Sequence, residues 1–276
     1  MAHPSISVSA RSRSAARVPR WEQALPGPIK RALWRGRHLA HHRLREIALR
    51  PSRFETEGRR EELAIRYLRG AGIEIGALFL PLAMPRGTRV RYVDHAGEDE
   101  LRARYARELQ MHNRPLIVPD VVDSGEELSS FADGSLDFVV ANHMLEHVED
   151  PIATLKTFLR VLRPGGVVFL TQPDARRTFD APRPRTTTEH VLRDHEQGPR
   201  VSRRDHYAEC ARLVEGVPED RVAARAAELE LEGARIHFHV WELETFLDLL
   251  VHLDLEADLE CAQRIEDEFA IVLRRR

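Results

Sequence analysis

Acidic, amide and glycine residues follow a series of short apolar segments in this 276-residue chain. Such residues could hold a nucleotide-like ligand, because a carboxylate accepts hydrogen bonds from both hydroxyls of a ribose. Asp94 follows Gly76 at about the spacing typical of a ribose-binding acid, roughly 20 residues. The candidate ligand-binding residues are Glu74, Gly76, Asp94, Asp120, Asp123 and Asn142.

Some of these candidates have plain structural alternatives. Asp94 could be an exposed loop acid or a helix cap. Asp120 and Asp123 could accept a hydrogen bond from an adenine amino group, or they could only close a turn.

Three of the fourteen histidines are candidates for proton transfer. His143 follows a predicted strand, and His237 and His239 form a His-x-His pair, which on a strand would place both rings on one face. A histidine near its free pKa is a usable general base at neutral pH. The alternative for each ring is a surface or packing role.

His143, Glu146 and His147 also match the spacing of an inverted zinc-protease motif, H-x-x-E-H. That chemistry needs both histidines on one helix face and a third ligand. The motif begins at a strand end here, so we interpret Glu146 and His147 as bracing the following loop. No metal site is expected.

The elements that must position these residues alternate along the chain. Apolar periodicity predicts helices at 56–69, 98–109, 151–162 and 241–250, and strands at 73–76, 89–94, 115–118, 136–141, 167–171, 255–261 and 269–273. This alternation favours an α/β fold with a mostly parallel sheet, and the two closing strands suggest an antiparallel edge. Ligands bind at the carboxyl ends of the strands in such sheets.

Three regions are expected. Residues 1–55 form a basic N-terminal arm that is partly disordered, with a short helix at about 29–49. Residues 56–174 and 236–276 form the core, and 175–235 form a helical cap over the substrate. The arm could be a solvated surface segment, a lid, or a docking element for nucleic acid, a partner protein or a second copy of the chain.

Several blocks together resemble one known family. They are Glu74-Ile75-Gly76, the strand-end acid Asp94, the run 136–151, and the run 159–166 that ends in Pro164-Gly165-Gly166. This pattern is similar to that of class I S-adenosylmethionine-dependent methyltransferases. The resemblance implies a Rossmann-like seven-stranded sheet whose last strand is antiparallel, with S-adenosylmethionine as the cofactor. One departure is a glycine-poor first loop, with Leu78 and Leu80 where the family has glycines.

The resemblance implies methyl transfer to a small-molecule acceptor, by analogy a sugar or secondary metabolite, through a histidine-assisted in-line displacement. The leucines in the first loop motivate an alternative. The chain could have lost the cofactor and catalyse a cofactor-independent elimination or cyclisation, or serve as a partner subunit.

Composition excludes other classes of protein. The net charge of −2 and the absence of an Asn/Asp-Pro-Pro-aromatic tetrad after residue 141 argue against nucleic acid as a partner. Two cysteines are too few for a disulfide framework, and no apolar run is long enough to span a membrane. A cytoplasmic location is expected, and two lysines among 42 basic residues suggest a GC-rich bacterial gene.

Overall fold

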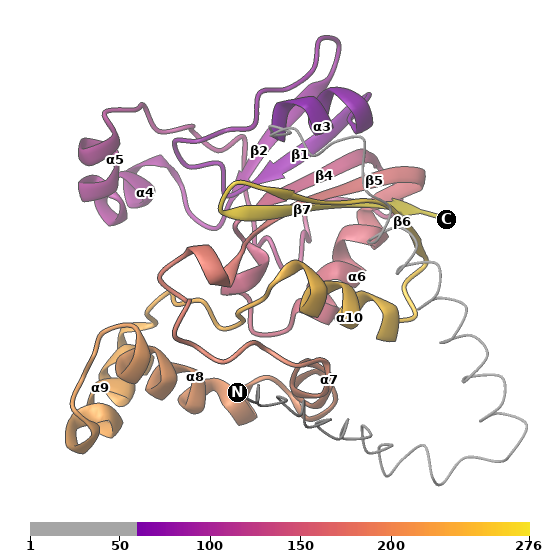
Figure 1. Cartoon of the computed structure of the whole chain (residues 1–276). Helices are drawn as coiled ribbons and strands as arrows, with labels where there is room; N and C mark the ends of the chain where they lie inside the picture. The colour runs from indigo at the N-terminus through magenta and orange to yellow at the C-terminus, as the bar shows by residue number, and fades with distance from the viewer. Residues whose placement is uncertain (1–59) are drawn as a thin grey trace, which may run out of the picture. The chain divides into compact units, whose positions relative to one another are not determined.

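The computed structural model describes residues 60–276, so the predicted arm and the helix at 29–49 lie outside the described residues. Within the described range, seven strands form one sheet with helices on both faces (Figure 1). The strands are β1 Ala71–Ile75, β2 Arg89–Asp94, β3 Val121–Val122, β4 Leu136–Asn142, β5 Leu162–Pro173, β6 Ala257–Ile265 and β7 Glu268–Arg275. The helices are α3 Arg60–Tyr67, α4 Glu98–Arg104, α5 Ala106–His112, α6 Pro151–Val161, α7 Thr188–Gln197, α8 Arg200–Leu213, α9 Glu219–Glu232 and α10 Leu243–His252, with short 3₁₀ turns η1 Leu145–His147 and η2 Ala175–Arg177.

The strand order is β3-β2-β1-β4-β5-β7-β6. Strands β1 to β5 pair in parallel, whereas β7 is antiparallel to both of its neighbours. The predicted α/β class and the antiparallel last strand are therefore confirmed. The two closing strands form the predicted antiparallel edge, with β6 outermost and β7 between β5 and β6. Burial explains the order: β7 is buried from Glu268 to Leu273, whereas most residues of the edge strand β6 remain partly exposed.

Two sequence-based boundaries are wrong. Residues 115–118 form a loop, whose Ile117 N–H donates to the Leu78 carbonyl at 2.6 Å, and the third strand is instead β3. Pro115 begins and Pro119 directly follows the predicted strand, and neither residue has an N–H to donate to a neighbouring strand. The helix predicted at 98–109 is two helices, because Tyr105 has non-helical backbone angles.

Alternating residues of β4 pack into two apolar cores, one on each face of the sheet. Phe138 and Val140 pack with α3 on one face of the sheet, and Val139 and Ala141 pack with α6 and α10 on the other. Burial of both faces explains why the strand is apolar at nearly every position. Asp150 starts α6 as predicted, since its side chain accepts the Ala153 N–H at 2.9 Å.

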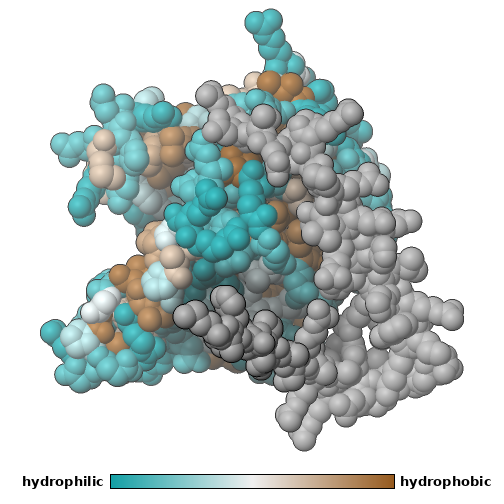
Figure 2. All heavy atoms as spheres, viewed as in Figure 1, coloured by the Kyte–Doolittle hydropathy of each residue, from teal (hydrophilic) through white to brown (hydrophobic). Residues whose placement is uncertain are grey.

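Helices α7, α8 and α9 follow β5 in the sequence and precede α10. Helices α8 and α9 share a small core with the segment that follows them, built on Tyr207, Ala226 and Phe238. The face seen in Figure 2 is largely hydrophilic, with scattered hydrophobic patches over α8 and α9. No helix among residues 60–276 is long and apolar enough to cross a membrane.

Candidate functional site

The parallel strands bring three of the predicted ligand-binding residues to one edge of the sheet. Ile75 pairs with Val93 on one side and with Ala141 on the other. The residues that follow these three positions are Gly76, Asp94 and Asn142, so they lie level with one another at the carboxyl ends of β1, β2 and β4. A ligand above this edge would meet all three.

The first loop leaves open space beside Gly76. The glycine has a left-handed φ of +66°, and a Cβ placed on it would have no atom within 4 Å apart from its chain neighbours. Leu78 also has a positive φ, +49°, and its side chain packs toward Ala96 and Leu101. The leucine that replaces a family glycine is therefore absorbed into a small apolar cluster and does not fill the space at Gly76.

Glu74 holds the end of this loop through hydrogen bonds to its backbone. Its carboxylate is 1% exposed and accepts the Leu82 N–H through both oxygens, at 2.9 and 3.2 Å. The Asn142 amide lies 3.4 Å from the same carboxylate. Burial raises the pKa of Glu74 to about 7 despite these hydrogen bonds. Glu74 thus shapes the loop around the site.

The three aspartates differ in what they can bind. Asp94 uses Oδ1 for the backbone N–H and the ring Nδ1 of His95, at 2.8 and 2.6 Å, and no hydrogen bond to Oδ2 occurs among the described residues. Asp123 accepts the Ser130 N–H at 2.7 Å. Burial opposes ionisation of Asp123, but this hydrogen bond and its neighbours hold its pKa below the ordinary value.

Asp120 lies two residues before Val122, the residue that is level with Asp94, and its role in ligand binding stays a prediction. It precedes β3, and its carboxylate accepts the Tyr92 N–H at 2.8 Å, so it closes the β2–β3 connection. A strand at 115–118 would have put Asp120 after its carboxyl end, whereas β3 begins after Asp120.

His143 lies at the same edge and contacts a partner that sequence reasoning missed. Its Nε2 is 2.7 Å from Glu268 Oε2, and Arg60 also pairs with Glu268. Burial raises the pKa of Glu268, but the hydrogen bonds from His143 and Arg60 outweigh this effect and lower it overall. Because β7 is antiparallel, its first residue reaches the edge where the parallel strands end, and this topology was the signal that could have identified Glu268.

His237 joins Glu146 and His147 in a buried acid–histidine cluster, which we define by these three residues. His237 Nδ1 lies 2.6 Å from Asp180 Oδ2, and His147 Nδ1 donates to the Ile236 carbonyl at 2.9 Å. The Glu146 carboxylate is 1% exposed, and neither oxygen has a hydrogen-bond partner among the described residues.

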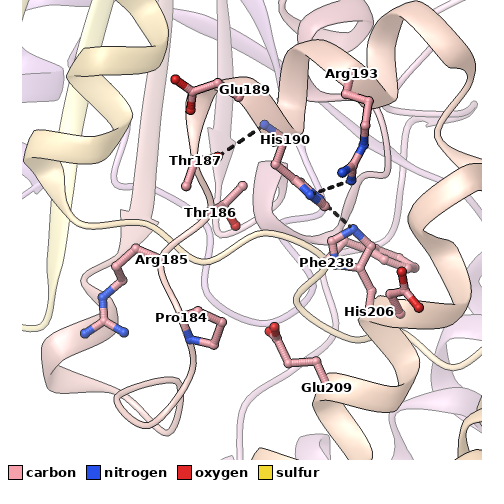
Figure 3. Close-up of a pocket in the computed structure, with 11 residues that line it drawn as sticks. Pro184, Arg185, Thr186, Thr187, Glu189, His190, Arg193, His206, Glu209 and Phe238 are labelled. Atoms are coloured by element: carbon pink, nitrogen blue, oxygen red, sulfur yellow. Dashed lines mark hydrogen bonds between the residues drawn. The ribbon is translucent and has the colours of Figure 1, made fainter. Parts of the chain in front are cut away.

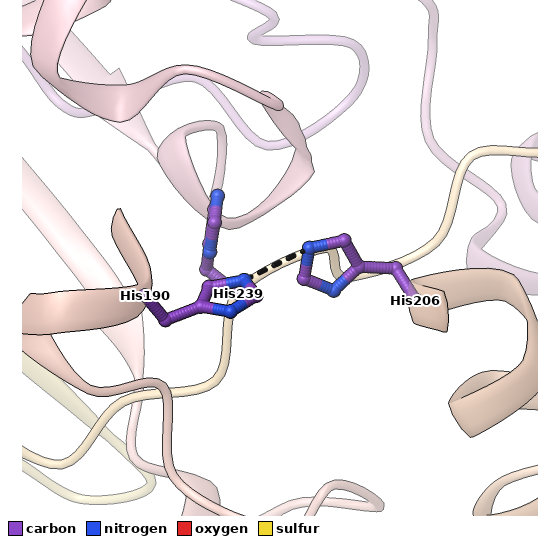
Figure 4. A group of neighbouring side chains, drawn as sticks. All are labelled: His190, His206 and His239. Carbon is purple, nitrogen blue, oxygen red and sulfur yellow. Dashed lines mark hydrogen bonds between the residues drawn. The ribbon is translucent and has the colours of Figure 1, made fainter. Parts of the chain in front are cut away.

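His239 lies in a different group, with His190 and His206 (Figure 4). The expectation that His237 and His239 share one face is wrong, because residues 236–240 do not form a strand. His239 is 1% exposed and stacks on Trp241 at 5.2 Å. Burial, then the proximity of His206, holds the pKa of His239 well below its ordinary value. It is too enclosed to remove a proton from a substrate directly.

A pocket of about 470 Å³ opens beside this second group of histidines (Figure 3). Its wall comes from residues 184–193, from α8 and from Phe238. His190 and His206 lie side by side in this wall, with their Nε2 atoms 3.1 Å apart. Charged side chains of both signs, including Arg193 and Glu209, line it and suit a polar occupant.

The edge formed by Gly76, Asp94 and Asn142 fits S-adenosylmethionine. Gly76 offers open space for close approach, Asp94 Oδ2 can accept from a ribose hydroxyl, and Asn142 faces the same edge. Strand order and site together are those of a class I S-adenosylmethionine-dependent methyltransferase, an enzyme class whose cofactor is S-adenosylmethionine.

Comparison with known proteins also identifies a methyltransferase. The chain belongs to the family described as a methyltransferase domain, whose pattern matches residues 39–256. The Ubiquinone biosynthesis O-methyltransferase of Xanthomonas campestris is 35% identical over 124 residues, which cover 45% of this chain and 49% of that protein. The chain thus spans about half the length of this curated relative. A solved SAM-dependent methyltransferase of Aquifex aeolicus aligns with 82% of this chain and 93% of its own, at 11% identity and a TM-score of 0.42.

Proposed function

We propose that this protein transfers the methyl group of S-adenosylmethionine to a small-molecule acceptor. The observation that carries the proposal is the alignment of Gly76, Asp94 and Asn142 at one edge, with open space at Gly76 and a free carboxylate oxygen on Asp94. The similarity to O-methyltransferases of ubiquinone biosynthesis supports an acceptor hydroxyl.

The cofactor supplies an electrophilic methyl group on a sulfonium. Asp94 would hold the ribose hydroxyls and Asp123 would border the adenine. Gly76 would let the backbone approach the cofactor closely. Glu74 and Asn142 would keep the first loop in place for that approach.

Two histidines are placed to handle the acceptor proton. His143 is oriented by Glu268, and His237 is oriented by Asp180, so each ring presents one nitrogen away from its carboxylate. A carboxylate bonded to one ring nitrogen favours the tautomer whose other nitrogen accepts a proton. Much of the acceleration would come from positioning and from exclusion of water by the helices of residues 175–235.

Calorimetric titration with S-adenosylhomocysteine tests the cofactor site. Asp94→Asn should weaken binding about 10- to 100-fold, because it removes a charged acceptor worth about 1.5–3 kcal/mol. Asp133→Asn is the matched control, since Asp133 is an exposed acid paired with Arg160. Equal affinity for the two variants would contradict the assignment of Asp94.

The second candidate is a protein that no longer uses the cofactor, motivated by Leu78 and Leu80. It predicts no binding of either S-adenosylmethionine or S-adenosylhomocysteine by folded protein that has been freed of co-purified cofactor. That result would favour a cofactor-independent elimination or cyclisation, or a partner-subunit role. Cytoplasmic location, a bacterial source and a role in secondary metabolism stay expectations.

A further inference from the structure

We propose that Glu146, His147 and His237 form a binding site for a divalent transition-metal ion such as Zn²⁺. The three side chains offer one carboxylate oxygen and two ring nitrogens, all within 4.8 Å of one another. Two histidines and one carboxylate are a recurrent ligand set for divalent first-row metals, and they leave coordination positions open. The ligands come from η1 and from the segment after α9, which are joined where the Phe238 N–H donates to the Glu146 carbonyl at 2.7 Å.

The histidines are already oriented as metal ligands. His147 donates from Nδ1 to the Ile236 carbonyl, and His237 donates from Nδ1 to Asp180. Both bonds leave the Nε2 lone pair free. Metal-bound histidines almost always carry such a second hydrogen bond to a carbonyl or carboxylate, which fixes the tautomer and the ring orientation.

Glu146 supplies an independent argument. Its carboxylate is buried, and neither oxygen has a hydrogen-bond partner among the described residues. An unpaired buried carboxylate is costly, and a bound cation would compensate that cost. The ring of His143 lies nearby, but its Nδ1 is 3.9 Å from Glu146 Oε1 and too far for a hydrogen bond.

The second histidine group is a poorer metal site. Arg193 lies 2.8 Å from His190 Nδ1 and can only donate, so the neutral ring must carry its proton on Nε2. That proton points toward His206, whose Nε2 is 3.1 Å away, and toward Asp194 Oδ2 at the same distance. His190 therefore cannot offer Nε2 to a metal without losing the Arg193 contact.

The role of the ion in catalysis rests on the proposed methyl transfer, whereas its binding does not. An acceptor hydroxyl at an open coordination position would have its pKa lowered by the ion. The O–H proton would pass to Nδ1 of His143, which Glu268 holds by the opposite nitrogen, and not to His237, because the ion would occupy the Nε2 lone pair of His237. The acceptor oxygen would then form its bond to the methyl carbon as the carbon–sulfur bond breaks, leaving a neutral thioether.

Metal titration of the full chain, without a polyhistidine tag and after removal of metal by EDTA, tests the site. We expect calorimetry to show a single Zn²⁺ bound per chain, and Co²⁺ to give a visible absorption band. Glu146→Gln and His237→Ala should weaken Zn²⁺ binding by about 100-fold or more, and Asp180→Asn by about 10- to 100-fold. His206→Asn is the matched control and should bind as the wild type does. Circular dichroism establishes that each variant is folded.

Two outcomes would overturn the proposal. One is folded wild-type protein that binds neither ion. The other is binding that survives Glu146→Gln but disappears in His206→Asn, which would move the ion to the second histidine group. S-adenosylhomocysteine titration without metal is read separately, so failure of the metal site is distinguishable from failure of the proposed methyl transfer.

Discussion

Asp180 Oδ2 lies 2.6 Å from His237 Nδ1, although the two residues are 57 positions apart in the sequence. The other oxygen of Asp180 accepts from Arg183 at 2.8 Å, and Arg183 also pairs with Glu209. Asp180 and Arg183 are almost fully buried. Burial raises the pKa of Asp180, but the bonds from His237 and Arg183 outweigh it and lower the pKa overall. The contact between Asp180 and His237 therefore connects the helical region 175–235 to the His237 ring of the acid–histidine cluster.

Arg183→Met should lower the free energy of unfolding by about 3–5 kcal/mol, because it leaves Asp180 as a buried charge without its cation. Arg212→Met is the control, since Arg212 pairs with Glu219 on the surface and such exposed pairs contribute little to stability. Urea unfolding measures both variants. Equal losses of unfolding free energy in the two variants would show that the buried pair stabilises the protein no more than the surface pair does.

Gly76→Ala should separate cofactor binding from stability. The new methyl group would stand in the open space of the site, so affinity for S-adenosylhomocysteine should fall at least about 10-fold, while the left-handed backbone should cost only about 1–2 kcal/mol. Gly87→Ala introduces the same kind of strain, at φ +85° with nothing within 4 Å. If Gly87→Ala weakens binding equally, the space at Gly76 is not the cofactor site.

Glu74 should make the protein less stable as the pH rises. Its pKa is about 7 in the folded chain against a usual 4.5, so the folded state holds more protons than the unfolded state between these values. The stabilising contribution is complete below pH 4.5 and is lost as the pH rises through 7. Glu74→Gln keeps an acceptor for the Leu82 N–H but does not titrate. Urea unfolding from pH 4.5 to 7.5 should show the wild type losing about 3 kcal/mol relative to this variant.

His206 should make the protein less stable as the pH falls. Burial, together with nearby His190, lowers its pKa to about 4 from a usual 6.5. The folded chain then binds fewer protons than the unfolded chain between these values, so stability falls as the pH drops through this window. His206→Asn should flatten part of that fall, which thermal unfolding at pH 7.5 and pH 5 would detect. An unchanged slope would assign the acid sensitivity to other groups, such as His239.

The sequence determined the order and type of the main elements. Apolar runs at 136–141 and 167–171 became central strands because both faces of the sheet are covered, and the Asp150-Pro151 pair started α6 as capping chemistry requires. Gly76, Asp94 and Asn142 could be placed at one edge from sequence, because parallel strands all end on the same side. These inferences depend on local periodicity and on the topology of the sheet, and both can be read along the chain.

Tertiary structure decided which side chains meet. His237 and His239 are two positions apart, yet one joins Glu146 and the other joins His206, because residues 236–240 are not a strand. Glu268 reaches His143 only because β7 runs against its neighbours, and Asp120 turns to Tyr92 because β3 begins after it. Contacts between residues far apart in the sequence depend on how elements pack in three dimensions, and the spacing of residues along a single chain carries no record of that packing.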